Sequence, residues 1–245
     1  CATLTYDDER IHLVVGDANL AAVEASILNF TSGFDIVIDD GSHSSGDIVR
    51  AFCRYFPHLR DGGMFVAEDL HCSYWGDYDG GLYRPFSSVS FFKRLADIVN
   101  HEHWGIEKTK RDLLSGFLNE YGVDLNELDL KSLHSVEFIN SICVVRKQAA
   151  DRNQLGRRVI AGQDEQVVPG RLEVSGSVSI PPPQATNPWT AMSVPPEQAF
   201  LVQKQELADL QQTIADKDAH IAALYNSLSW RVTDRKSTRL NSSHG

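Results

Sequence analysis

Apolar residues recur along the chain in two alternating patterns, short unbroken runs and stretches with helical spacing. The short runs are mostly apolar and are bounded by Gly or acidic residues, as is typical of β-strands, and they cover residues 11–15, 34–39 and 64–67. Apolar residues at helical spacing predict helices over 18–30, 47–59 and 88–99, the second capped by Asp47. Strands that alternate with helices in this order predict an α/β fold with a right-handed parallel sheet. We expect the strands at 34–39 and 64–67 to be buried on both faces.

Residues 70–146 continue this domain with less regular patterns. The segment 70–87 is aromatic and Gly-rich and follows the end of a predicted strand, so it is either a substrate loop or lid or a purely structural loop. Residues 101–130 predict irregular helix. The two β runs at 132–138 and 141–146 predict a closing antiparallel hairpin.

A change in composition near residue 150 ends the predicted domain, which we place at residues 1–149. Seven of the nine prolines lie between Pro169 and Pro196, so residues 150–198 predict a disordered linker. In residues 199–233 apolar residues return at a and d spacing, interrupted by Gln203 and Lys217. This pattern predicts either a modest coiled coil, joining a homo-oligomer or a partner, or an amphipathic helix docked on the domain. Residues 234–245 resemble a translated sequencing adapter and are excluded from the functional argument.

The composition argues against several classes of function. A formal net charge of -10 disfavours nucleic acid and anionic membranes as partners, because phosphate binding requires basic clusters. No apolar stretch approaches the ~18 residues that are needed to span a bilayer. The four cysteines have no zinc-like spacing, and Cys53 and Cys143 lie in apolar surroundings, as small core residues do. These features predict a protein of the reducing cytoplasm.

Acidic residues end two successive predicted strands, Asp39 and Asp40 after the first and Glu68 and Asp69 after the second. The carboxyl ends of parallel strands line the ligand crevice of an open α/β sheet, so we expect these acids to converge there. Clustered carboxylates repel one another unless a cation lies among them, and a hard ion such as Mg²⁺ binds oxygen ligands. His43 follows Asp40 by three residues. A histidine, with a reference pKa of about 6.5 for the free side chain, is suited to accept a proton near neutral pH.

Each piece also has a simpler interpretation. Asp39-Asp-Gly-Ser-His43 alone is more often a capped turn, and Glu68-Asp69 alone is a pair of solvated loop acids. His71 lines or caps the following loop, and no role is assigned to it. Together, at the ends of successive strands, the acids and His43 favour a metal site with a neighbouring base.

Five motifs carry a family resemblance: Val15-Gly-Asp17, Ile38-Asp-Asp-Gly-Ser-His43, Leu59-Arg-Asp-Gly-Gly63, Val66-Ala-Glu-Asp69 and Ser73-Tyr-Trp75. With them, residues 11–147 resemble the C-terminal part of class I, metal-dependent O-methyltransferases of the macrocin and mycinamicin type, which have a Rossmann-like sheet. The resemblance implies S-adenosylmethionine and Mg²⁺ as cofactors. It further implies these site residues: Asp40, Glu68 and Asp69 as metal ligands, His43 as base, Gly16, Asp17, Asn19 and Asp39 near the cofactor, and Tyr74 and Trp75 near the acceptor.

The resemblance also implies that the first strand of the family and its Gly-rich cofactor loop precede residue 1. We therefore expect this N-terminally truncated stretch to lack the first strands of the sheet, to bind S-adenosylmethionine poorly and to be inactive alone. The sheet is then expected to have an exposed hydrophobic edge.

The function predicted for the parent protein is methylation of a sugar hydroxyl on a small molecule or glycan. Two alternatives remain open. One is a non-haem iron hydroxylase, a class that favours two histidines and one carboxylate as metal ligands. The other is a non-catalytic coiled-coil scaffold in surface-polysaccharide assembly, which would use the helix at 199–233.

Overall fold

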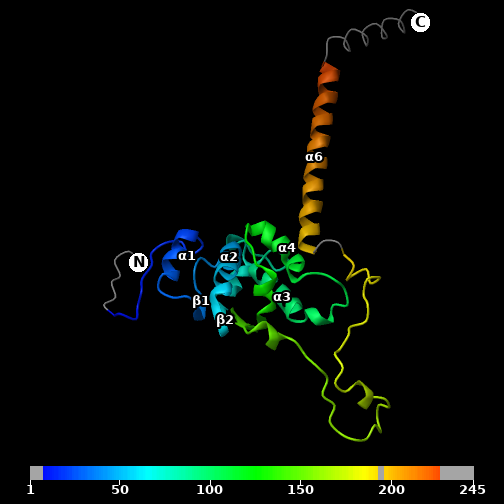
Figure 1. Cartoon of the computed structure of the whole chain (residues 1–245). Helices are drawn as coiled ribbons and strands as arrows, with labels where there is room; N and C mark the ends of the chain where they lie inside the picture. The colour runs from blue at the N-terminus through cyan, green and yellow to red at the C-terminus, as the bar shows by residue number, and fades with distance from the viewer. Residues whose placement is uncertain (1–7, 193–195, 227–245) are drawn as a thin grey trace, which may run out of the picture. The chain divides into compact units, whose positions relative to one another are not determined.

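A computed structural model describes residues 8–192 and 196–226 of the chain (Figure 1). The chain divides into two compact units at the boundary between Glu197 and Gln198. The predicted end of the last helix at 227–233 and the adapter-like residues 234–245 lie outside the described residues.

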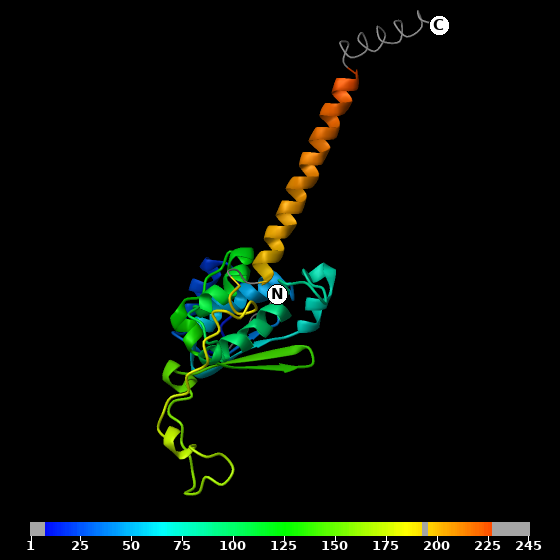
Figure 2. The ribbon, with the colours of Figure 1, turned by 90° about the vertical axis from the view of Figure 1, so that its right-hand side faces the viewer.

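The first unit is built on a four-stranded sheet with the order β1-β2-β4-β3. Its strands are β1 (Phe34–Asp39), β2 (Leu59–Ala67), β3 (Leu133–Ile139) and β4 (Ile142–Lys147). β1 and β2 are parallel, whereas β4 is antiparallel to both β2 and β3. The β3–β4 hairpin, visible in Figure 2, confirms the predicted antiparallel closure.

The strand predicted at 11–15 does not form, so that prediction is wrong. These residues have no β-sheet partner among the described residues, and an apolar run without a neighbouring strand cannot satisfy its backbone groups by pairing. Ile11, Leu13 and Val15 are 46%, 48% and 62% exposed.

The helices of the first unit are α1 (Ala21–Leu28), α2 (Ser45–Tyr55), α3 (Ser88–Val99), α4 (Lys110–Tyr121) and α5 (Glu127–Lys131). The α3 prediction is confirmed at both ends. α2 begins earlier than predicted, with Ser44 rather than Asp47 at its N-cap position, because the Asp47 carboxylate instead accepts from Ser42 and Arg50. The 70–87 segment contains two short 3₁₀ turns, η2 (Leu70–Tyr74) and η3 (Gly76–Tyr78).

Phe52 of α2 is fully buried in a cluster of aromatic rings. Its ring lies edge-on to Phe65 of β2 and to Phe91 and Phe92 of α3, with centroid distances of 5.1, 5.4 and 5.7 Å. Phe56 stacks on it at 4.8 Å. The rings join the helical layer of α2 and α3 to one face of the sheet. Cys53, Cys72 and Cys143 are buried and free, which agrees with the expectation of core cysteines at Cys53 and Cys143.

The two faces of β1 differ in their cover. Val37 is paired in register with Phe65, so its side chain lies on the face that the helices cover. Ile36 and Ile38 point to the opposite face and are 53% and 58% exposed. Burial on both faces is therefore wrong for β1, because α2 and α3 lie on the Phe65 side. β1 is also the terminal strand of the sheet, so the described part of the molecule has the exposed apolar edge that the sequence predicts.

The Pro-rich segment 150–192 is irregular and contains no buried residue. It includes two 3₁₀ turns, η5 (Ala150–Asn153) and η6 (Leu172–Val174). The backbone N–H of Gln184 donates to the carbonyl oxygen of Gly105 at 2.8 Å, so this segment returns to the surface of the first unit.

The helix α6 (Pro196–Asn226) forms where the sequence predicts it. Its apolar a and d residues are between 49% and 61% exposed; they are Phe200, Leu207, Leu210, Ile214, Ile221 and Leu224. The coiled coil and the oligomer stay predictions. No helix within the described ranges is long and apolar enough to cross a bilayer.

Candidate metal centre and active site

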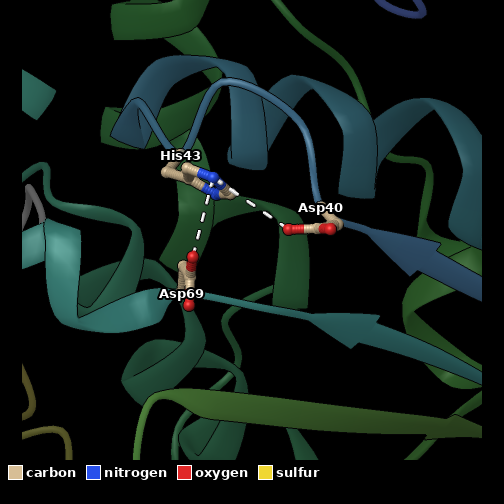
Figure 3. Close-up of side chains that lie close together, drawn as sticks. All are labelled: Asp40, His43 and Asp69. Carbon is tan, nitrogen blue, oxygen red and sulfur yellow. Dashed lines mark ion pairs between the residues drawn. The ribbon is translucent and has the colours of Figure 1, made fainter.

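Three side chains from two strand ends converge at the carboxyl edge of the β1–β2 pair (Figure 3). Asp40 follows β1, His43 lies in the loop before α2, and Asp69 follows β2. The imidazole lies between the two acids: its Nε2 is 4.0 Å from Asp40 Oδ1 and 3.7 Å from Asp69 Oδ2. One ligand atom from each residue lies within 4.8 Å of the others.

This donor set fits a hard divalent cation such as Mg²⁺. Carboxylate oxygens are the ligands that Mg²⁺ prefers, and the ion keeps several waters, so an open site suits it. The side chains of Asp40 and Asp69 are 64% and 49% exposed, which leaves room for waters and for a substrate oxygen. The group contains one histidine and two carboxylates, the reverse of the ratio that iron oxygenases favour.

The backbone at two of these residues has an uncommon conformation. His43 and Asp69 have φ angles of 57° and 48°, in the left-handed region. Non-glycine residues are rare there, and such positions concentrate at functional sites because the surrounding structure must enforce them. Part of that enforcement comes from Ser42, whose Oγ donates to Asp47 Oδ2 at 2.6 Å and accepts from the backbone N–H of Ser44 at 3.3 Å.

Glu68, the remaining predicted ligand, is not a member of this group among the described residues. Its backbone N–H donates to the carbonyl oxygen of Asp39 at 3.0 Å, which extends the β1–β2 pairing by one bond. Neighbouring residues at a strand end point in different directions, so Glu68 and Asp69 are not brought to the same place by their adjacency in sequence.

Asp39 lies on the covered face of β1, opposite Ala67 in register. Burial raises the pKa of its carboxyl to about 6, against the lowering effects of a hydrogen bond from the Gly41 backbone and of the charge on His43. Its Oδ2 is buried and has no hydrogen-bond partner. A buried oxygen in this state is uncommon and is a natural contact point for a ligand hydroxyl or N–H group.

Asn19 is the second predicted cofactor residue with such an atom, because its Oδ1 is also buried without a partner. Its Nδ2 donates to the carbonyl oxygen of Asp47 at 3.4 Å, and the Tyr55 hydroxyl donates to the carbonyl oxygen of Ala18 at 2.7 Å. These bonds hold the turn formed by residues 16–19 against α2, the helix that follows His43. Gly16 and Asp17 of the same turn are exposed.

The 70–87 segment places the predicted acceptor residues Tyr74 and Trp75 at the surface, 43% and 52% exposed. The chain reverses at Gly80, whose N–H donates to the carbonyl oxygen of Trp75 at 2.9 Å. A Cβ at Gly80 would lie 2.4 Å from the carbonyl oxygen of Ser73, so the reversal requires glycine. Ser44 Oγ donates to Asp79 Oδ2 at 2.9 Å and ties this segment to the His43 loop.

Sequence reasoning missed two contacts at this site. His71, to which no role was assigned, lies beside Asp69 and bonds Ser141 of the β3–β4 turn. Asp79 holds Ser44. Both contacts join residues far apart in the chain, and no local pattern in the sequence announces such pairs.

Comparison with known proteins places the chain among relatives that are O-methyltransferases of sugar-bearing natural products, which confirms the resemblance carried by its motifs. The chain is 41% identical over 100 residues to the 8-demethyl-8-alpha-L-rhamnosyl tetracenomycin-C 2'-O-methyltransferase of Streptomyces olivaceus, covering 40% of this chain and 26% of that protein. It is 34% identical over 137 residues to the mycinamicin VI 2''-O-methyltransferase of Micromonospora griseorubida, covering 54% and 32%. The chain thus spans about a quarter to a third of these relatives. No family model matches it.

Among solved structures, the chain is similar to the MycE methyltransferase of the mycinamycin biosynthetic pathway. In its complex with Mg, SAH and mycinamycin VI, the identity is 26% and the TM-score 0.45, covering 59% of this chain and 34% of that one. In a complex with Mg and SAH the identity is 25% and the TM-score 0.48, covering 64% and 38%.

Proposed function

We propose that this chain contributes the metal-binding and proton-accepting side of an O-methyltransferase site. The substrate is a sugar hydroxyl on a small molecule or glycan, and the cofactors are S-adenosylmethionine and Mg²⁺. One observation carries the proposal: Asp40, His43 and Asp69 converge at two strand ends in a chain with relatives that are sugar O-methyltransferases.

Asp40 and Asp69 would hold the metal, with Glu68 as a third carboxylate at the same strand end. Asp39 and Asn19 would face the cofactor, each through an oxygen that is buried without a partner, and Gly16 and Asp17 belong to the same turn as Asn19. The exposed Tyr74 and Trp75 would contact the acceptor, because aromatic rings offer sugars an apolar face.

When bound, Mg²⁺ would make the acceptor hydroxyl more acidic, and S-adenosylmethionine would supply the methyl group, with its sulfur as the leaving group. His43 Nε2 accepts the hydroxyl proton. The imidazolium that results is stabilised by Asp40 and Asp69, whose oxygens lie 4.0 and 3.7 Å away. With 23% of its side chain exposed, His43 can return the proton to solvent.

The metal assignment is tested by titrating the chain with Mn²⁺, followed by electron paramagnetic resonance. We expect Asp40→Asn and Asp69→Asn each to weaken binding about tenfold or more, since each removes a charged ligand. Glu68→Gln tests the third carboxylate, and Asp151→Asn, an exposed acid of η5, is the matched control. Equal affinities in the wild type, Asp40→Asn and Asp69→Asn would overturn the metal site.

The base assignment is tested by turnover in the mycinamicin VI 2''-O-methyltransferase of Micromonospora griseorubida, by replacing the residue that aligns with His43 by alanine. Loss of a general base predicts a fall in kcat of roughly 10²–10⁴-fold with Mn²⁺ affinity retained. Unchanged turnover would refute the base role.

A further inference from the structure

Asp69 has a second histidine beside it. One carboxylate oxygen, Oδ2, lies 3.7 Å from His43 Nε2, whereas the other, Oδ1, lies 3.8 Å from His71 Nδ1. The carboxylate is half-exposed and its backbone is left-handed, so burial of the side chain does not fix its orientation. The two imidazoles flank it from opposite ends.

His71 is itself fixed by the β3–β4 turn. Its Nδ1 makes a 2.6 Å hydrogen bond with Ser141 Oγ, and the carbonyl oxygen of Ser141 accepts from the backbone N–H of Leu70 at 2.8 Å. Ser141 therefore contacts both residues that follow Asp69. Ser141 has a φ of 69°, another left-handed non-glycine residue, so the turn that presents its hydroxyl is strained.

The opposite side of the His71 ring is also occupied. The indole of Trp75 lies edge-on to the imidazole with a centroid distance of 4.8 Å, and Cys72 Sγ is 3.8 Å from Nε2. A ring held by a hydroxyl on one nitrogen and by an indole and a thiol elsewhere has few alternative rotamers. A residue held in place beside a metal ligand generally sets the orientation of that ligand and its affinity for the metal. A fixed His71 ring is therefore suited to orient Asp69.

We propose that His71 is a positioning residue for Asp69, and that Ser141 orients His71 from the β3–β4 turn. The imidazole keeps Oδ1 of Asp69 on its own side and thereby leaves Oδ2 directed at Asp40 and His43. This inference rests on the proposed function, because it takes Asp69 as a metal ligand. It also connects the metal site to Trp75, the expected acceptor residue, through a single ring.

The test is the Mn²⁺ affinity of the full chain, measured by electron paramagnetic resonance, in a set of matched variants. We expect His71→Leu and Ser141→Gly each to weaken Mn²⁺ binding about tenfold, in the range found when partners of metal ligands are removed. Glycine is chosen at position 141 because it removes the hydroxyl and accepts the positive φ. His71→Asn keeps a polar atom near the position of Nδ1 and is expected to restore most of the affinity.

Two controls separate positioning from general damage. His134→Leu removes another imidazole with a side-chain partner, the 2.8 Å contact between His134 Nδ1 and Asn153 Oδ1, and is expected to leave Mn²⁺ affinity unchanged. In the double variant the losses from His71→Leu and Ser141→Gly are expected to be non-additive, because both break one chain of contacts.

The outcomes distinguish this inference from the proposed function. If Asp69→Asn weakens Mn²⁺ binding while His71→Leu and Ser141→Gly do not, the positioning role is overturned and the metal site stands. If Asp69→Asn has no effect while Asp40→Asn weakens binding, Asp69 is not a ligand and this inference fails alone; if neither has an effect, the metal site itself fails and this inference fails with it. Weak binding in His71→Asn equal to that in His71→Leu would show that a polar atom near the position of Nδ1 does not restore the site, and would overturn the positioning role, as would unchanged binding in His71→Leu, which is expected of a merely space-filling residue.

Discussion

The two faces of the β1–β2 pair have similar side chains and different surroundings. On one face Val37 and Phe65 lie under α2 and α3, and Phe65 joins the cluster of rings around Phe52. On the other face Ile36 and Ile38 are more than half exposed. Apolar side chains alone therefore do not show which face contributes to stability, because that depends on what packs against them. The candidate site lies at the carboxyl ends of these two strands.

The largest change in stability is expected from a substitution that leaves a cavity on the covered face. Phe52→Ala should lower the free energy of unfolding by about 3–5 kcal/mol, since it deletes a fully buried ring that contacts four others. Urea denaturation followed by circular dichroism measures the change. A loss below about 1 kcal/mol would mean that the covered face is not the main source of stability.

A smaller effect is expected from Tyr121, on the α4 helix of the same side. Its hydroxyl donates to the carbonyl oxygen of Phe86, so Tyr121→Phe should cost about 1 kcal/mol.

Burial raises the pKa of Tyr121 to about 12. In the unfolded chain the phenol ionises near pH ~10, so its extra stability is present below that pH and is lost as the pH rises toward the folded-state pKa. Tyr121→Phe should flatten the stability profile between those values. Identical alkaline profiles for the two proteins would contradict the assigned cause.

The smallest effect should come from the uncovered face. Ile38→Thr keeps a β-branched side chain and removes exposed apolar surface, so it should change the free energy of unfolding by less than about 0.5 kcal/mol. We expect it to reduce self-association, measured by analytical ultracentrifugation against the wild type. A loss comparable with that of Phe52→Ala would show that Ile38 is buried in solution.

Much of the fold followed from periodicity. The run at β1, the helical spacing of α3 and the paired runs of the hairpin all formed close to their predicted bounds, whereas β2 ends as predicted but begins at Leu59, the predicted last residue of a helix, and not at Met64. The run at 11–15 has the same composition as a strand but no neighbour to pair with among the described residues, and a sequence pattern does not contain that information. The same limit applies to Ile36 and Ile38, whose pattern is that of a strand covered on both faces.

The candidate site was predictable in its residue types more than in its contacts. Asp40, His43 and Asp69 converge as their places at strand ends suggested, because the carboxyl ends of parallel strands meet at one edge. The contact of His71 with Ser141 spans 70 positions and depends on how the hairpin packs. Asp39 has a buried oxygen because the helices cover its face of the sheet. The sequence does not show which face is covered, and the neighbouring Asp40 is exposed.

The left-handed backbone at His43 and Asp69 places the proposed function and the stability of the fold in opposition. A non-glycine residue in that conformation costs on the order of 1–3 kcal/mol, so each of these residues weakens the fold that holds it. Glycine would relieve the backbone at either position and would remove the side chain that gives the site its chemistry. Selection for more stable variants of this chain would therefore favour glycine at these two positions, and the gain in stability would come with the loss of the candidate site.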